Sequence, residues 1–545
     1  MTIMHSVALQ IHPNDDLIVA LADICAGQQV SLGGKNYQVI EPIRAKHKFA
    51  GRDFYKGELL TQYGITVGEA LCDIPAGTAI KLGNARHSSQ AYQANSIEYQ
   101  WQAPDVTQLQ QRSFQGFRRA DGQVGTANYW LVVPLVFCQN RNIEMMRNAL
   151  QDALGYSSEA HYIDYARNLV RAYQSDTTPV PATRHGVGKK VFPNVDGVKF
   201  ITHSAGCGGT REDALALCKL LAGYIYHPNV AGATILSLGC QNAQISLLQQ
   251  ELSKLDPQHN TPVLWFEQQQ YGQERPMLED AIDQTLQGLA VANLCQREAV
   301  PLSHLRIGVE CGGSDGFSGL SANPLIGRVA DKTVALGGSA ILGEFPELCG
   351  VEQNILDRCK SDALRGRFSD LMKGYQRHAQ AVGASFDMNP SPGNIRDGLI
   401  TDAMKSAGAA LKGGSAPISD VLDYTQVLTQ SGLNLLCTPG NDVESTTALA
   451  ATGANLILFS TGSGTPTGNP IVPVLKISSN SGTAERMHDI IDFDAGAIIS
   501  GQKSVDTLAD QLMELCIETA SGDNTCKAQQ LGQDDFIPWK RGVSL

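Results

Sequence analysis

The fold of this chain is decided by the stretch Leu305-Arg306-Ile307-Gly308-Val309-Glu310-Cys311-Gly312-Gly313-Ser314-Asp315-Gly316, in which a short apolar run ends in glycines. A short apolar run bounded by turn residues is typical of a buried strand. Further runs of this kind occupy Tyr129–Phe137, Ala233–Leu238 and Asn455–Phe459. Helix-like stretches, including Asp213–Gly223 and Gln284–Cys295, alternate with them. This order predicts an α/β fold with mainly parallel sheets.

The first part of the chain has a different pattern. From Ser6 to Asn84, short apolar runs alternate with glycines, which predicts a small β-rich module of strands joined by turns. A polar stretch without a clear period follows, and a proline-rich segment at 384–398 must interrupt the helices. We therefore expect a β module over residues 1–90, a linker over 91–112, a central α/β domain over 113–385 and a C-terminal α/β domain over 386–545.

Composition narrows the class of function. The chain has 545 residues, of which 42 are Lys or Arg and 54 are Asp or Glu, so its formal net charge is −12. This balance argues against nucleic-acid binding, which needs clustered excess positive charge. No apolar run is long enough to span a membrane, and the first residues do not form a signal peptide. We expect a cytoplasmic protein whose partners are small anions and further copies of the same chain, as a homo-oligomer.

Four of the thirteen cysteines end an apolar strand or lie in a glycine turn: Cys138, Cys207, Cys240 and Cys311. Loops at the carboxyl ends of parallel strands can meet, and three converging thiolates can hold a ferrous ion or an iron–sulfur cluster with one iron open to substrate. We favour Cys207, Cys240 and Cys311 as such a set. Taken singly, each cysteine is better explained as a small core residue.

Two other positions offer acid–base chemistry. His47 lies between Lys46 and Lys48, whose charges disfavour a cationic imidazole, so a neutral base or metal ligand is one interpretation and a surface histidine is the other. Glu344 and Glu347 flank a proline and are either an acid–base pair, or metal-supporting carboxylates, or an ordinary exposed loop.

Two glycine-rich loops remain to be interpreted. The loop Gly312–Gly319 lacks the lysine of a phosphate-binding P-loop and the spacing of a dinucleotide fingerprint, so it does not predict nucleotide binding. The loop Ser460–Gly468 offers hydroxyls and backbone amides suited to a carboxylate or polyol, or is a plain connection.

Taken together, these motifs resemble the altronate and galactarate dehydratase family of sugar-acid hydro-lyases over nearly the whole chain. The N-terminal stretch with His47-Lys48 is similar to the SAF-type module of that family. The resemblance extends through the following motifs: Gly116–Gly125, Cys311–Asp315 with Ala322-Asn323-Pro324, Asn389–Asn394, Pro439-Gly440-Asn441-Asp442 and Asp492–Gly496. The last two motifs are closer to the altronate branch.

The resemblance implies iron-assisted removal of water from a six-carbon aldonate or aldarate, leaving a 2-keto-3-deoxy acid. On this basis we expect His47 to be a base or ligand and Lys48 to bind a carboxylate or enolate, with iron at Cys207, Cys240 and Cys311. The expected substrate-binding residues are Ser314, Asp315, Asn323, Asn394 and Thr465.

Three positions depart from the family pattern by losing positive charge: Ala127, Ile395 and Ser463. Because Arg and Lys are the usual partners of carboxylates, the substrate or its mode of binding is expected to differ from that of the relatives. The alternatives are a lyase of the same family acting on galactarate or releasing sulfite from a sulfonated hydroxy acid, and a non-catalytic sugar-acid binding protein.

Overall fold

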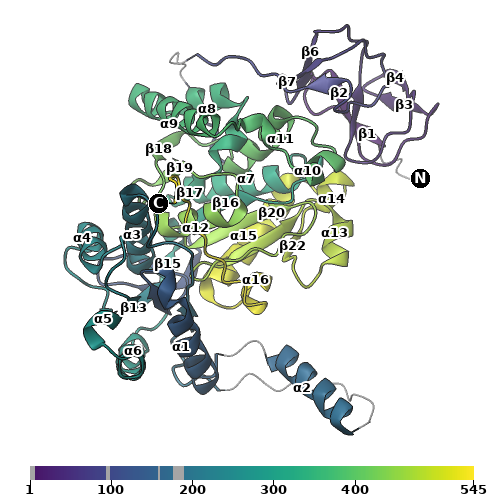
Figure 1. The fold of residues 1–545 in the computed structure, drawn as a ribbon. Helices are drawn as coiled ribbons and strands as arrows, with labels where there is room; N and C mark the ends of the chain where they lie inside the picture. Colours follow the sequence, from purple (N-terminus) through teal and green to yellow (C-terminus); the bar gives the residue numbers. More distant parts are fainter. Residues whose placement is uncertain (1–5, 94–98, 157–159, 176–188, 545) are drawn as a thin grey trace.

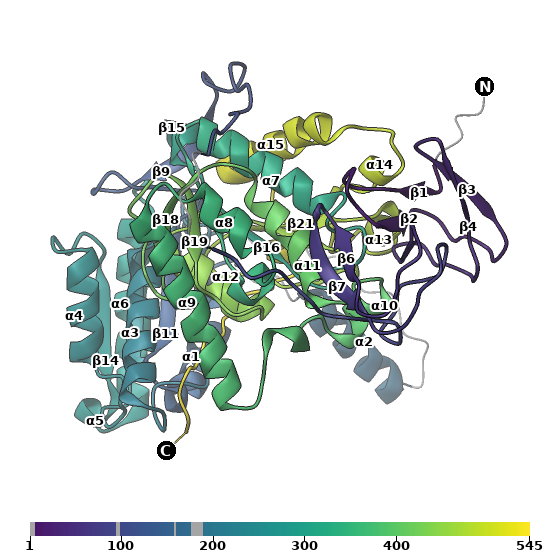
Figure 2. The same cartoon turned by 90° about the horizontal axis from the view of Figure 1, so that it is seen from above.

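The computed structural model describes residues 6–93, 99–156, 160–175 and 189–544, which form a β module and two α/β bodies (Figure 1). The predicted fold class is confirmed: parallel sheets follow a small N-terminal β region. Figure 2 shows the β module beside the body that carries α10 (Pro392–Arg396) and α11 (Asp402–Ala409). Among the described residues, no helix is long and apolar enough to cross a membrane.

The β module consists of short antiparallel strands joined by tight turns. In order they are β1 (Ala8–Leu9), β2 (Leu17–Ala20), β3 (Gln29–Leu32), β4 (Lys35–Gln38), β5 (Lys48–Ala50), β6 (Leu59–Gln62), β7 (Ile65–Ala70) and β8 (Ala85–Arg86). Gly33 and Gly34 both have positive φ, as the two-residue hairpin between β3 and β4 requires. The apolar residues of β2, β6 and β7 share a core with Ile400, Ala403 and Met404, which attaches the module to α11.

The central body is built on a four-stranded parallel sheet of order β12-β11-β13-β14. Its strands are β11 (Tyr129–Pro134), β12 (Gly197–Phe200), β13 (Val230–Ser237) and β14 (Val263–Glu267). Alternate side chains of β11 enter different cores, because successive residues of a strand point to opposite faces. Tyr129 and Leu131 pack with α3 (Arg211–Tyr226) and α4 (Ile245–Leu255). Trp130 packs on the other face with α1 (Asn140–Ala153) and α6 (Glu274–Ala292).

Helices and a small sheet complete the central body. The remaining helices are α1 (Asn140–Ala153), α2 (Ala160–Ser175), α5 (Gln268–Tyr271) and α6 (Glu274–Ala292), and an antiparallel sheet joins β10 (Val124–Gly125), β9 (Ser113–Arg118) and β15 (Glu298–Pro301). The two strands and two helices that the sequence predicts in this body are confirmed as β11, β13, α3 and α6. The predicted linker is also consistent with the structure, since its described residues form no helix or strand between β8 and β9.

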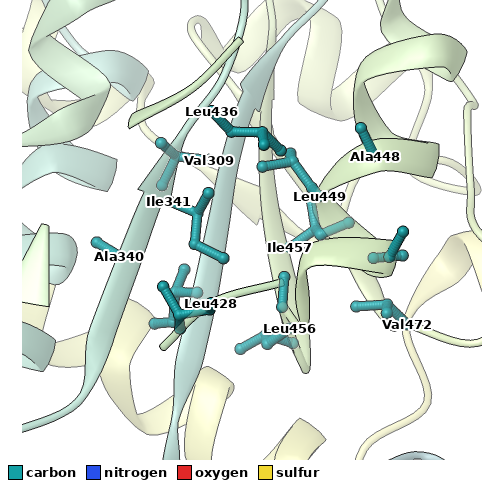
Figure 3. Packing of buried hydrophobic residues seen from close by; sticks show 14 of the residues in the cluster. Val309, Ala340, Ile341, Leu428, Leu436, Ala448, Leu449, Leu456, Ile457 and Val472 are labelled. Carbon is teal, nitrogen blue, oxygen red and sulfur yellow. The ribbon is translucent and has the colours of Figure 1, made fainter. Parts of the chain in front are cut away.

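The C-terminal body contains a seven-stranded parallel sheet of order β18-β19-β17-β16-β20-β21-β22. Its strands are β16 (Arg306–Cys311), β17 (Ser339–Leu342), β18 (Ile418–Leu422), β19 (Gly432–Leu436), β20 (Leu456–Thr461), β21 (Val474–Ser478) and β22 (Phe493–Asp494). Apolar side chains of the central strands pack against α12 (Asp442–Thr452): Leu449 of this helix lies beside Ile457 of β20 (Figure 3).

Several helices surround this sheet. They are α7 (Ala322–Ala335), α8 (Glu352–Arg358), α9 (Asp362–Ala381), α13 (Ser481–Arg486), α14 (Gly496–Ile499), α15 (Val505–Ser521) and α16 (Lys527–Gln530). The helices α12 and α3 join the two α/β bodies closely: a Cβ on Gly223 would lie 2.5 Å from the carbonyl oxygen of Ala451. One hydrophobic core therefore continues from one body into the other.

The structure corrects the predicted boundary at residues 385/386. The strands β16 and β17 precede that position and β18 to β22 follow it, yet all belong to one sheet. Residues 384–398 do contain the predicted interruption, but it is a loop with short helices inside the C-terminal body. A proline-rich break shows where a helix ends, whereas strand pairing decides which segments share a body. The two α/β bodies meet near residue 302.

Candidate active site

A cavity of about 1000 Å³ opens at the carboxyl edge of the seven-stranded sheet. The chain leaves β16 toward β17 on one side and later returns on the other side as β20, so the strand order reverses at β16. Ligands of open α/β sheets bind outside the carboxyl ends of the strands at such a reversal. Cys311, Gly312, Asn394, Lys405, Asp442 and Arg541 are among the residues that line the cavity.

Beneath the cavity, a thiol and two carboxyl groups meet at the ends of β16 and β17. Cys311 Sγ lies 3.1 Å from Glu347 Oε2 and 3.7 Å from Glu344 Oε2, and all three residues are buried. Glu344 has a φ of 61°, and its backbone N–H donates to Thr438 Oγ1 at 2.7 Å. A non-glycine residue held in this strained conformation is a common feature of functional sites.

Two lysines compensate the charge of these groups. Lys405 on α11 pairs with Glu347 Oε1 at 2.6 Å. Lys412, in the 3₁₀ segment Ala410–Gly413, bonds to Glu344 Oε2 and lies 2.9 Å from Cys311 Sγ. The glutamates are therefore a buried, ion-paired cluster, which the sequence offered as one interpretation beside an exposed loop.

The charges set the proton affinities in this cluster. Burial and the charge of Glu347 raise the pKa of Glu344 to about 7, against the attraction of Lys412. For Glu347, burial acts in the same direction, but Lys405 and Lys412 overcome it and lower the pKa to about 2. Burial raises the pKa of the Cys311 thiol well above its usual value. At neutral pH, Glu347 is ionised and Cys311 is protonated.

Asp442 is the acidic residue on the opposite side of the cavity floor. It begins α12 directly after the N-cap Asn441, and its carboxyl group packs on Gly312, where a Cβ would lie 2.0 Å from Oδ2. Burial and then the charge of Glu347 raise the pKa of Asp442 to about 6, against the attraction of Lys476. A carboxyl group in a cavity with a pKa near 6 has the property expected of a general base.

The β module contributes His47 and Lys48 to the rim of this region. His47 Nε2 lies 3.0 Å from the carbonyl oxygen of Arg396, and Lys48 Nζ donates to the carbonyl oxygen of Gly398 at 2.6 Å. The pKa of His47 is lowered, chiefly by burial and then by Lys48 and Arg44, so the expected direction holds although burial is its main cause. His47 therefore contacts the last residue of α10, and Lys48 contacts the loop that follows this helix.

The structure separates the five predicted substrate-binding residues into two groups, and the first group is Asn394, Ser314 and Thr465. Asn394 lines the cavity and donates from Nδ2 to the carbonyl oxygen of Ser314 at 2.7 Å. The hydroxyl of Ser314 is buried without a hydrogen-bond partner among the described residues. Thr465 lies beside Gly313, where a Cβ would come within 2.8 Å of its hydroxyl.

The other two predicted substrate ligands hold the protein together. Asp315 is buried and accepts hydrogen bonds from Ser318 and Ser479, while Lys46 of the β module pairs with it at 2.8 Å. Asn323 donates to the carbonyl oxygen of Gly408 and accepts from the hydroxyl of Ser460. Their polar atoms are therefore engaged within the fold.

The three cysteines proposed as an iron site do not meet. Cys311 is buried at the end of β16, whereas Cys207 and Cys240 are exposed at the edge of the other parallel sheet. Among the described residues, Cys311 gathers only with Glu344 and Glu347 at metal-ligand distances, and the Lys412 ammonium already lies against its sulfur. The Lys412 ammonium thus already supplies a positive charge beside Cys311. The predicted set of Cys207, Cys240 and Cys311 does not fit a single iron ion.

The three positions that lost positive charge lie away from the cavity lining. Ala127 is buried between Arg119 and Asn229, and Ile395 packs against the core of the β module. The exposed Ser463 donates to Asp397 at 3.4 Å. Cations reach the cavity from other elements: Lys405, Lys540 and Arg541 line it.

Sequence reasoning missed Lys405, Lys412 and the role of Asp442. The two lysines belong to a segment without a motif of its own, so only the fold brings them to Cys311. Asp442 stood in the quoted Pro-Gly-Asn-Asp motif, where a turn followed by a helix start at a strand end was the available signal.

Three family models together match most of the chain. Residues 6–88 match the altronate/galactarate dehydratase SAF domain, residues 116–293 match the second domain of D-galactarate dehydratase/altronate hydrolase, and residues 302–544 match the C-terminal domain of D-galactarate/altronate dehydratase. These limits agree with the body boundary near residue 302.

Individual relatives cover nearly the same length. The chain is 34% identical to altronate dehydratase of Escherichia coli (strain K12) and 31% identical to that of Bacillus subtilis (strain 168), in each case over 98% of this chain and 99% of the relative. It is 27% identical to the (2R)-sulfolactate sulfo-lyase subunit beta of Chromohalobacter salexigens over 79% of this chain and 98% of the relative.

Proposed function

The chain belongs to the D-galactarate/altronate dehydratase family, and from this premise we propose that it is a hydro-lyase that removes water from an altronate-like aldonate. The product is a 2-keto-3-deoxy acid. The chemistry takes a proton from the carbon beside the carboxylate and expels the hydroxyl of the next carbon. It needs a cation for the carboxylate and the developing enolate, a base, and a proton donor for the departing oxygen.

The observation that carries this proposal is that Lys405 and Asp442 line the same cavity. Asp442, with a pKa near 6, is largely ionised at neutral pH and takes the proton from the substrate. Lys405 is held by Glu347 and keeps its positive charge, so it binds the substrate carboxylate and stabilises the enolate that forms. A base and a cation at one site are what the first half of the reaction requires.

Cys311 is the proton donor for the departing hydroxyl in this proposal. Cys311 lines the cavity, and its thiol stays protonated at neutral pH because burial raises its pKa. Glu344, with a pKa near 7, lies 3.7 Å from the sulfur and supplies the next proton. Lys540 and Arg541 also line the cavity and attract an anionic substrate.

The experiment is an assay of the full chain against a panel of aldonates and aldarates, following 2-keto acid formation. We expect turnover of an altronate-like acid and its loss in Asp442→Asn. Glu444→Gln is the matched control, because Glu444 lies in the same helical turn but does not line the cavity. Turnover by Asp442→Asn at the wild-type rate would remove the assigned base.

A second candidate substrate class is supported by the similarity to the sulfo-lyase subunit. In this case the chain acts on galactarate or releases sulfite from a sulfonated hydroxy acid. Adding sulfonated hydroxy acids to the panel and measuring sulfite separates the two classes. Binding of sugar acids without turnover of any of them would favour the non-catalytic alternative.

The thirteen cysteines are all free thiols, which suits the cytoplasm that we propose as the site of action.

A further inference from the structure

Three exposed cysteines stand at the carboxyl edge of the central parallel sheet. Cys138 follows β11, Cys207 follows β12 and Cys240 follows β13. β11 lies between the other two strands and pairs with both of them in parallel, so the three strand ends are neighbours. Cysteine is among the most buried residue types, and three exposed thiols on adjacent strand ends therefore call for an explanation.

Backbone hydrogen bonds hold the three loops against one another. The N–H of Phe137, next to Cys138, donates to the carbonyl oxygen of Ala205 at 3.1 Å. The N–H of Ala243 donates to the carbonyl oxygen of Gly206 at 3.0 Å. The loop with Cys207 therefore lies between the loops that carry the other two cysteines.

Gly206 makes this arrangement possible. It has a φ of 98°, and a Cβ at this position would lie 2.4 Å from the carbonyl oxygen of Leu135. Only glycine lets the loop lie this close to the end of β11. Each of the three cysteines lies in the loop before a helix, namely α1, α3 or α4.

The spacing of the thiols distinguishes two kinds of metal site. Thiolates that share one ion through bonds of about 2.3 Å have sulfur atoms about 4 Å apart. In the described part of the chain, ligand atoms gather this closely in two groups, and neither contains these cysteines. A cluster binds each thiolate to a different iron and so accepts a wider spacing.

We propose that Cys138, Cys207 and Cys240 bind three irons of a [4Fe–4S] cluster and leave the fourth iron open to an oxygen ligand. Binding replaces three thiol protons by three Fe–S bonds, and the iron and inorganic sulfide come from solution. The proposal rests on the proposed function for its purpose, because an open iron beside a sugar-acid site can take a substrate hydroxyl or carboxylate.

The C-terminal segment connects this edge with the active-site cavity. Trp539 and Lys540 line that cavity and also line a smaller one, of about 80 Å³, that contains Cys207. The N–H groups of Arg541 and Gly542 donate to Asp213, in the first turn of α3 that follows the Cys207 loop. The cysteine edge is therefore adjacent to the wall of the proposed active site.

The test is anaerobic reconstitution of the full chain with sulfide and equal amounts of ferrous and ferric iron. No added oxidant is then needed to assemble the cluster. We expect about four irons and four acid-labile sulfides per chain, with visible absorption of a cluster. The variants Cys138→Ser, Cys207→Ser and Cys240→Ser should each lose most of this iron and sulfide while keeping the wild-type melting temperature. Cys25→Ser, Cys72→Ser and Cys311→Ser are controls that should retain it.

Several outcomes would overturn the cluster. The first is binding of one iron without sulfide. The second is full retention of iron and sulfide by Cys138→Ser, and the third is loss of iron and sulfide from Cys311→Ser. Failure of the proposed function looks different: a chain with iron and sulfide bound but no sugar-acid turnover keeps the cluster and rejects the activity. Turnover by a chain free of iron and sulfide keeps the activity and rejects the cluster.

Discussion

Lys405 and Glu347 form a buried ion pair, with 2.6 Å between Nζ and Oε1. Asn389 supports both partners: its Oδ1 accepts from Lys405 at 2.8 Å, and its Nδ2 donates to Glu347. A buried pair of this kind is expensive to break, because removal of one partner leaves the other charge uncompensated. The pair therefore fixes the position of the ammonium that the substrate carboxylate is proposed to meet.

Lys405→Met is expected to abolish turnover and to lower the free energy of unfolding by about 3–5 kcal/mol, because Glu347 loses its principal partner. The double variant Lys405→Met/Glu347→Gln should regain much of the stability but none of the activity. Denaturant unfolding and turnover of all variants, including Glu347→Gln, form the required cycle. A double variant less stable than Lys405→Met would contradict the assignment.

The pH dependence of turnover should show an acid limb with an apparent pKa near 6. Asp442 acts as a base only when ionised, so activity is lost as the pH falls through the pKa of this carboxyl group. Measurement of kcat and kcat/KM from pH 5 to pH 9 tests this assignment. An acid limb that is unchanged in a residually active Asp442→Asn variant would reject it.

Lys476 should tune the position of that limb. It is buried, and its Nζ lies 3.3 Å from the centroid of the Phe459 ring without a hydrogen-bond partner among the described residues. Its positive charge lowers the pKa of Asp442. Lys476→Met is therefore expected to move the acid limb to higher pH, whereas Lys503→Met, at an exposed lysine, leaves the limb in place. A limb that moves to lower pH in Lys476→Met would contradict this coupling.

The sequence predicts the strands well because buried runs such as Leu305–Val309 are local features. It does not show which strands share a sheet, since that depends on contacts between distant segments. For this reason it selected Cys311 as a companion of Cys207 and Cys240, although Cys311 ends a strand of the other sheet. Cys138 had the same local signal and belongs to the sheet of the other two.

The active-site lysines show a second limit of prediction from the sequence. The sequence offered Glu344 and Glu347 as an acid–base pair, as metal-supporting carboxylates or as an exposed loop. Their partners Lys405 and Lys412 carry no local pattern and lie about sixty residues further along the chain. Burial creates the need for these cations, and burial is a property of the folded state. Asp442 was quoted in a motif, yet its raised pKa also depends on its surroundings.

Docking of the β module should depend on Gly398. This glycine has a φ of 94°, and a Cβ there would lie 2.3 Å from the carbonyl oxygen of Lys46. Gly398→Ala is expected to loosen the module, with faster hydrogen exchange in 46–48 and 391–398. Gly383→Ala is the matched control, because Gly383 also has a positive φ of 74° but no atom within 4 Å of the added Cβ. Both variants carry the backbone cost of about 1–2 kcal/mol, so only Gly398→Ala should expose the interface.

His47 offers a choice between catalysis and positioning. The lowered pKa of its imidazole favours the neutral form, whose Nε2–H can donate to the carbonyl oxygen of Arg396 at 3.0 Å. If His47 is a catalytic base, as the sequence suggests, both His47→Ala and His47→Gln should abolish turnover. If it positions α10, which carries Asn394, His47→Gln should restore much of kcat because its amide also donates a hydrogen bond, whereas His47→Ala should raise KM and lower kcat. The pH profile of His47→Gln decides between them, since loss of a base would remove an ionisation from kcat/KM and loss of a positioning contact would leave the limb near pH 6 intact.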